Sequence, residues 1–318
     1  MKQIKHILLS SVILLLTAGC TKEELPGEVV DTPGITLDLR IANPLPDTKG
    51  GAETTLLRSA EGYLQAGQVL TRASLPSLEN ESVIKNVYVL FYAQGAAATS
   101  APALFQAATG LNAQDGYSFD LDYNSLADKL VAGTKYDIYV LANLPSSTTT
   151  ALSGSTTKEA LSALNEQQFE RTLTEPGISF SGSGTFTYDK GNRETIAIGL
   201  SRTVARLDIF LSNLDLQGKT VDVQVFNQAA TVRYFAETNT APSPVRYFKC
   251  TTIRNYVTGG FYTYVYPNYE GSGYEKATVT IIISNADGSI AYMYESAEIN
   301  RGTIERNKIY KITFQLSS

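Results

Sequence analysis

Short runs in which apolar and polar residues alternate recur along this chain. In residues 34–41, GITLDLRI, every second side chain is apolar, so one face of an extended segment would be buried and the other hydrated. The same two-residue period is present in residues 219–226, KTVDVQVF, and in residues 308–316, KIYKITFQL. Each of these segments is therefore predicted to form a half-buried β-strand.

Two other runs are apolar on both faces, namely residues 83–92, VIKNVYVLFY, and residues 136–142, YDIYVLA. Strands that are buried on both faces lie inside a sheet, so we predict central strands here. Residues 277–284 and 290–295 flank an Asp-Gly pair at 287–288, and Asp-Gly between two apolar runs is a strong hairpin signal. From these runs we expect the following residues in the core: Val87, Val89, Tyr139, Val140, Ile281 and Ile283.

Helical signals are few. Residues 156–168 contain Thr156 and Glu159 at the spacing of a capping box, which predicts a helix that begins after Thr156. A second short helix is expected within residues 122–131. Many short strands with turn residues between them are typical of β-sandwiches. We predict an all-β fold with two domains, residues 34–200 and 201–318.

Residues 43–75 lie between the first predicted strand and the next, and they show no sustained periodicity. They are rich in glycine and proline. A loop of this length inside a domain is usually functional or disordered. It contains two arginines, Arg58 and Arg72.

The first residues form a secretory signal, since Lys2 and Lys5 precede an apolar run of about half the ~20 residues that a membrane-spanning helix needs. Leu16-Thr-Ala-Gly-Cys20 at its end resembles the bacterial lipobox. The resemblance implies that residues 1–19 are removed and that the thiol of Cys20 carries lipid, which would tether the chain to the membrane. The alternative is an ordinary secretory signal with an incidental cysteine. Residues 20–33 are predicted to be a flexible tether.

The composition argues against several classes of function. The only histidine, His6, lies in the signal, and Cys250 is the only thiol apart from Cys20. A mature chain of this kind has no intrachain disulfide, no Ser-His-Asp or Cys-His mechanism and no His- or Cys-based zinc site. The net charge of -5 disfavours nucleic acid as a partner. We expect neither an enzyme nor a bound metal or cofactor.

Four segments resemble the fimbrillin superfamily, the FimA/Mfa-like subunits of type V pili: YDIYVLAN (136–143), LSRTVARLDI (200–209), GGFYTYVYPN (259–268) and IERNKIYKI (304–312). Their order and spacing match as well. The resemblance implies two transthyretin-like β-sandwich domains and a lipoprotein precursor that is held at the outer membrane through Cys20. It also implies assembly with other fimbrillin subunits into a surface pilus that contributes to adhesion. Whether the pilus binds a host or bacterial surface receptor is left open by the sequence.

The resemblance further implies that an arginine-specific protease removes the first strand, residues 34–41, and that a strand from another subunit replaces it. By position, the cleavage site is the bond between Arg72 and Ala73, with the bond between Arg58 and Ser59 as second choice. An anchor subunit would keep its strand and its lipid, and a tip subunit would accept a strand without donating one. A surface glycan-binding lipoprotein remains the rival, although the absence of Trp counts against it.

Three other groups of residues suggest a structural explanation more than a functional one. The aromatic run at 261–269 is expected to be a strand packed on both faces. The aspartates at 115, 120 and 122 lack a calcium-loop motif. Arg202, Arg206 and Asp208 at a strand start are expected to form surface ion pairs.

Overall fold

The computed structural model contains a unit of residues 33–318. Within it the structure describes residues 33–42, 45–46, 57–59, 62–64, 79–167, 177–212, 218–226, 231–235, 250–253, 261–267, 278–298 and 304–315. No helix in these ranges is long and apolar enough to cross a membrane. The predicted signal, the lipid site at Cys20 and the predicted tether up to residue 32 lie outside the described residues, as do Arg72 and Ala73.

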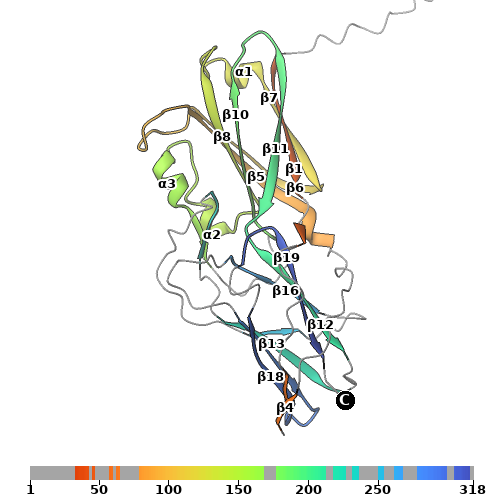
Figure 1. Cartoon of the computed structure of the whole chain (residues 1–318). Helices are drawn as coiled ribbons and strands as arrows, with labels where there is room; N and C mark the ends of the chain where they lie inside the picture. Colours follow the sequence, from red (N-terminus) through yellow and green to blue (C-terminus); the bar gives the residue numbers. More distant parts are fainter. Residues whose placement is uncertain are drawn as a thin grey trace, which may run out of the picture. The chain divides into compact units, whose positions relative to one another are not determined.

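The first sheet runs in the order β6-β5-β8-β10-β11-β1-β7 among the described residues (Figure 1). Its strands are β1 (Gly34–Ile41), β5 (Val83–Ala93), β6 (Leu104–Gln114), β7 (Gly116–Asp122), β8 (Lys135–Ala142), β10 (Phe180–Thr187) and β11 (Arg193–Arg202). β10 and β11 pair only near one end, at Phe180 and Ser181. Strands from both sides of this junction contribute to one core, as in a sandwich.

Glycine is required where β10 crosses β11. A Cβ atom on Gly182 would lie 2.4 Å from the carbonyl oxygen of Gly199, which is closer than any side chain tolerates. The bare backbone at Gly182 therefore allows the two parts of the sheet to approach each other.

Both faces of β5 are buried, as its sequence predicts. Val87, Val89 and Phe91 point into the sandwich core. Tyr88, Leu90 and Tyr92 point the other way, into a second cluster that includes Leu161. Leu161 belongs to α3 (Lys158–Ala163), one of the short helices, with α1 (Tyr123–Leu126), α2 (Ser146–Thr149) and the 3₁₀ helix η1 (Glu79–Ser82).

Two further sheets pack around another core, which includes Leu207, Ile281 and Phe314. One has the order β16-β12-β19-β2, and the other β15-β13-β17-β18. Their strands are β2 (Leu45–Pro46), β12 (Ala205–Ser212), β13 (Thr220–Phe226), β15 (Cys250–Ile253), β16 (Phe261–Val265), β17 (Thr278–Ser284), β18 (Ile290–Glu298) and β19 (Lys308–Gln315). Short ladders join β3 (Leu57–Ser59) to β4 (Gly62–Leu64) and β9 (Asn165–Gln167) to β14 (Thr231–Arg233).

The all-β fold with few short helices is confirmed, and so are the strands predicted from alternation. β17 and β18 form the predicted hairpin, and Gly288 in its turn has a positive φ of 84°. Of the six predicted core residues, five are buried, whereas Tyr139 is only half-buried. The division into domains at residues 200 and 201 stays a prediction.

Two local predictions were wrong. The helix α3 is capped by Thr157, whose side chain accepts a hydrogen bond from the backbone N–H of Ala160. Thr156 accepts instead from the backbone of Ser153, so its hydroxyl stabilises the preceding turn. The segment 43–75 is also not free of regular structure, because β2, β3 and β4 lie within it.

Candidate functional site: the position of β1

β1 is an interior strand of the first sheet and lies between β11 and the edge strand β7. It is parallel to β11 along its whole length and antiparallel to β7 from Gly34 to Arg40 (Figure 1). Ladder bonds therefore hold it on both sides. We call the space between β7 and β11 that this strand fills the β1 position.

The inward face of β1 belongs to the sandwich core. Ile35, Leu37 and Leu39 are 1%, 0% and 0% exposed, and they pack with side chains from the facing strands. Ile41 is half-buried against the same core. Loss of β1 would thus open three apolar sites together with two unpaired strand edges.

The outward face of β1 carries a polar contact that spans three strands. The hydroxyl of Thr36 donates a hydrogen bond of 2.6 Å to Oδ1 of Asp120 on β7. Nη1 of Arg193 on β11 donates to the same hydroxyl at 3.1 Å and to Asp120 at 3.3 Å. Further along, the exposed Arg40 and the half-buried Asp38 form an ion pair of 2.8 Å.

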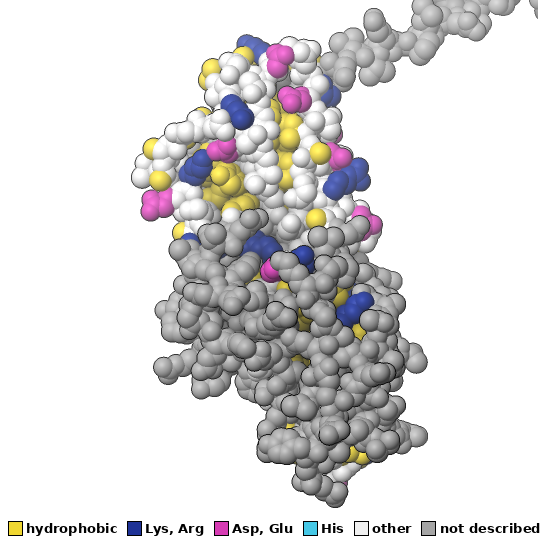
Figure 2. All heavy atoms as spheres, in the orientation of Figure 1, with side chains coloured by type: hydrophobic (Ala, Val, Ile, Leu, Met, Phe, Trp, Pro, Cys, Tyr) yellow, Lys and Arg dark blue, Asp and Glu magenta, His cyan; other side chains and the backbone are white. Residues whose placement is uncertain are grey.

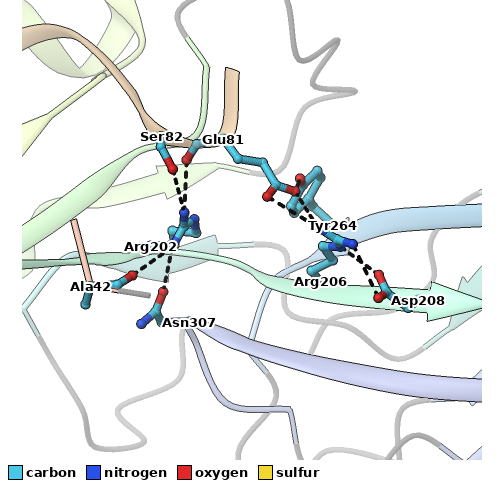
Figure 3. A network of polar contacts seen from close by, with 8 residues as sticks. All are labelled: Ala42, Glu81, Ser82, Arg202, Arg206, Asp208, Tyr264 and Asn307. Carbon is cyan, nitrogen blue, oxygen red and sulfur yellow. Dashed lines mark hydrogen bonds and ion pairs between the residues drawn. The ribbon is translucent and has the colours of Figure 1, made fainter. Parts of the chain in front are cut away.

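Arg202 holds the carboxyl end of β1. Its Nη1 donates to the carbonyl oxygen of Ala42 at 2.9 Å and to the side chain of Asn307 at 3.2 Å. Its Nη2 reaches the backbone oxygen of Glu81 and the hydroxyl of Ser82, which directly precede β5 (Figure 3). One guanidinium group therefore contacts the chain on both sides of the segment 43–78.

Arg206 lies next to this group and is more deeply enclosed. Its guanidinium group contacts Asp208 at 2.6 Å and Glu81 at 3.0 Å, and the hydroxyl of Tyr264 donates to Glu81 as well (Figure 3). The side chains of Arg206, Glu81 and Asp208 are only 5%, 2% and 0% exposed. The prediction that Arg202, Arg206 and Asp208 form surface ion pairs was wrong, because all three residues are buried.

The two arginines respond differently to burial. Loss of hydration lowers the pKa of Arg202, and the nearby Glu81 offsets this only in part. Burial alone would also lower the pKa of Arg206, but the hydrogen bond and charge of Asp208, with those of Glu81, outweigh it and raise that pKa. Nε of Arg202 is buried and has no hydrogen-bond partner among the described residues. Glu81 and Asn307, which complete this network, were not identified from the sequence.

Other described residues that the sequence singled out lie in strands or contact buried acidic side chains. Arg58 and Ser59 lie in β3, where Arg58 pairs with Tyr63 of β4. In the aromatic run, Tyr266 donates a hydrogen bond of 2.8 Å to the buried Glu166, and Tyr264 contacts Glu81.

Among the described residues, no acidic cluster is suited to a metal ion. Acidic and basic side chains are interspersed over the described part of the face in Figure 2.

No protein-family model and no curated protein sequence matches this chain. Solved structures match its fold. A candidate cell adhesion protein of Parabacteroides distasonis shares 14% identity at a TM-score of 0.58, over 90% of this chain and 88% of that one. A fimbrial assembly protein of the same species shares 12% identity at a TM-score of 0.53, over 90% of this chain and 92% of that one.

The tip fimbrial protein Mfa3 of Porphyromonas gingivalis, with a C-terminal truncation, shares 12% identity at a TM-score of 0.52, over 90% of this chain and 96% of that one. At sequence identities this low, the structural matches establish a common fold and nothing more. The resemblance to fimbrillins that the sequence segments predict is therefore confirmed at the level of the fold.

Proposed function

We propose that this protein is a structural subunit of a cell-surface pilus that contributes to adhesion and joins other subunits by strand exchange at the β1 position. The observation that carries this proposal is the place of β1. It is the first strand of the described chain, yet it is inserted between β11 and β7, paired on both sides, and fills a core with Ile35, Leu37 and Leu39. The folds of the fimbrial proteins named above support it.

The physics of exchange favours a replacement strand over an empty site. A strand added to a sheet gains main-chain hydrogen bonds, while alternate side chains fill pockets. The vacated β1 position would expose unpaired edges and apolar pockets, and such edges aggregate. A precursor that keeps β1 until use, tethered through lipid on Cys20, avoids this exposure.

Release of β1 requires a cut in the segment 43–78, and we propose the bond after Arg72. Arg58, the second choice, lies in the β3–β4 ladder, where backbone hydrogen bonds hinder the binding of a protease to the chain. A cut after Arg72 would leave β2 on the released piece. β2 pairs with β19, so this short ladder must open as well.

Treatment of the purified precursor with an arginine-specific protease tests the proposal. We expect cleavage after Arg72, followed by slow formation of oligomers, while uncut protein stays monomeric. Cutting alone should leave β1 bound, because its ladder bonds and buried side chains persist. Arg72→Ala should block oligomers, and Arg58→Ala, the matched control, should leave them unchanged. N-terminal sequencing and size-exclusion chromatography give the readouts.

If Arg72→Ala forms normal polymers without a cut at Arg58, strand exchange triggered by cleavage is wrong for this subunit. The anchor role or the glycan-binding role would then be favoured. A subunit that is cut and accepts a strand, but never extends beyond a pair, would be a tip subunit.

The lipid has its own test. Metabolic labelling with a palmitate analogue should mark the wild-type protein and not Cys20→Ser, because the thiol is the proposed point of attachment. After membrane fractionation, the wild-type protein should be found with the membranes and the variant in the soluble fraction. Equal labelling of both proteins would show that the lipobox interpretation is mistaken, and it would leave the proposal for the β1 position standing.

A further inference from the structure

The apolar face of β1 does not by itself determine how a strand is placed along the β1 position. Side chains alternate with a period of two, so a strand displaced by two residues still buries apolar groups. Ile35, Leu37 and Leu39 are similar in size, which makes such displaced arrangements close in energy. Some other contact must distinguish the correct register.

We propose that Asp120 and Arg193 select the register of the strand at the β1 position by recognising one hydroxyl side chain between them. This inference rests on the proposed strand exchange and names its specificity determinant. Asp120 of β7 lies directly opposite Thr36, and Arg193 of β11 contacts the hydroxyl of Thr36 from the other side. The proposed partner is an extended segment of another subunit that carries Ser or Thr at the position of Thr36.

The hydroxyl is suited to this contact because it is both a donor and an acceptor. Thr36 donates to Asp120 and accepts from Arg193 at the same time. Valine has the same shape and offers neither bond. A carboxylate at this place would meet the charge of Asp120, which is 64% exposed and already contacted by Arg193.

Displacement by two residues is disfavoured in both directions. One direction places Asp38 opposite Asp120, where like charges repel. It also moves Thr36 to the place of Gly34, where a Cβ atom would lie 2.5 Å from the carbonyl oxygen of Leu121. The opposite displacement removes the hydroxyl, because Gly34 then faces Asp120, and it brings Thr32 to the crowded place. The polar contact and the close approach therefore agree on one register.

Peptide exchange in the full chain tests this inference. A protease site inserted between residues 65 and 78 allows the chain to be cut without reliance on Arg72. Fluorescent peptides of residues 33–42 then compete for the β1 position, in four forms: wild type, Thr36→Ser, Thr36→Val and Asp38→Ala. We expect the valine peptide to bind about fivefold more weakly than wild type, equivalent to about 1 kcal/mol. The serine and alanine peptides should bind within about twofold of wild type.

The same peptides on an Asp120→Ala protein show whether the hydroxyl acts through Asp120. There the difference between the threonine and valine peptides should shrink, because only the hydrogen bond from Arg193 to the hydroxyl remains. On a protein that carries both Asp120→Ala and Arg193→Met the two peptides should bind equally. If these two peptides bind equally to the wild-type protein and still replace β1, register selection is wrong and the proposed strand exchange stands. If no peptide enters the cut protein, strand exchange itself is refuted and register selection with it.

Discussion

Replacement of Arg206 by methionine should lower the free energy of unfolding by about 3–5 kcal/mol. The loss arises because Glu81 and Asp208, at 2% and 0% exposure, would then be buried without the cation that contacts both. A buried carboxylate without a compensating positive charge is much less favourable than a hydrated one. Urea titration followed by circular dichroism measures the change.

Arg193→Met is the matched control for this experiment. It removes an arginine from another ion pair, but Asp120 there is 64% exposed and remains hydrated. Exposed pairs contribute about 0–1 kcal/mol. Arg206→Lys should fall between the two variants, since an ammonium group keeps the charge and loses the forked geometry. Equal losses for Arg206→Met and Arg193→Met would contradict the role assigned to burial.

The second large effect is expected at the centre of β1. Leu37→Ala should lower the free energy of unfolding by about 2–5 kcal/mol, because it deletes a side chain with 0% exposure from a packed core. It should also accelerate replacement of β1 in the cut protein, because the resident strand is held less firmly. Denaturant titration and the rate of peptide incorporation measure the two effects.

Asp38→Ala provides the comparison on the adjacent residue of the same strand. Asp38 faces outward and pairs with the exposed Arg40, so its loss should change stability by less than about 1 kcal/mol. If Leu37→Ala destabilises the protein without accelerating replacement, the step that limits exchange does not involve release of β1. A loss below about 0.5 kcal/mol would instead contradict the burial of this face.

Local pattern was sufficient for most strands. β1, β13 and β19 alternate with a period of two, and that period depends only on the geometry of an extended chain. β5 was predicted as a central strand because both faces are apolar, and it lies between β6 and β8. Helix limits were less predictable, since Thr156 and Thr157 both suit a cap. Only the packing of the preceding turn decides between them.

The sequence by itself determined that residues 34–41 form a strand with one buried face, and it marked Arg202, Arg206 and Asp208 as charged neighbours. Only the tertiary structure decided that β1 lies between β7 and β11, and that Glu81 and Asn307 come to the two arginines from more than 100 residues away. The physical reason is that burial depends on every segment that packs around a side chain. Alternation along a strand reports its two faces, whereas the strand's neighbours and the hydration of its charges arise only when distant segments meet.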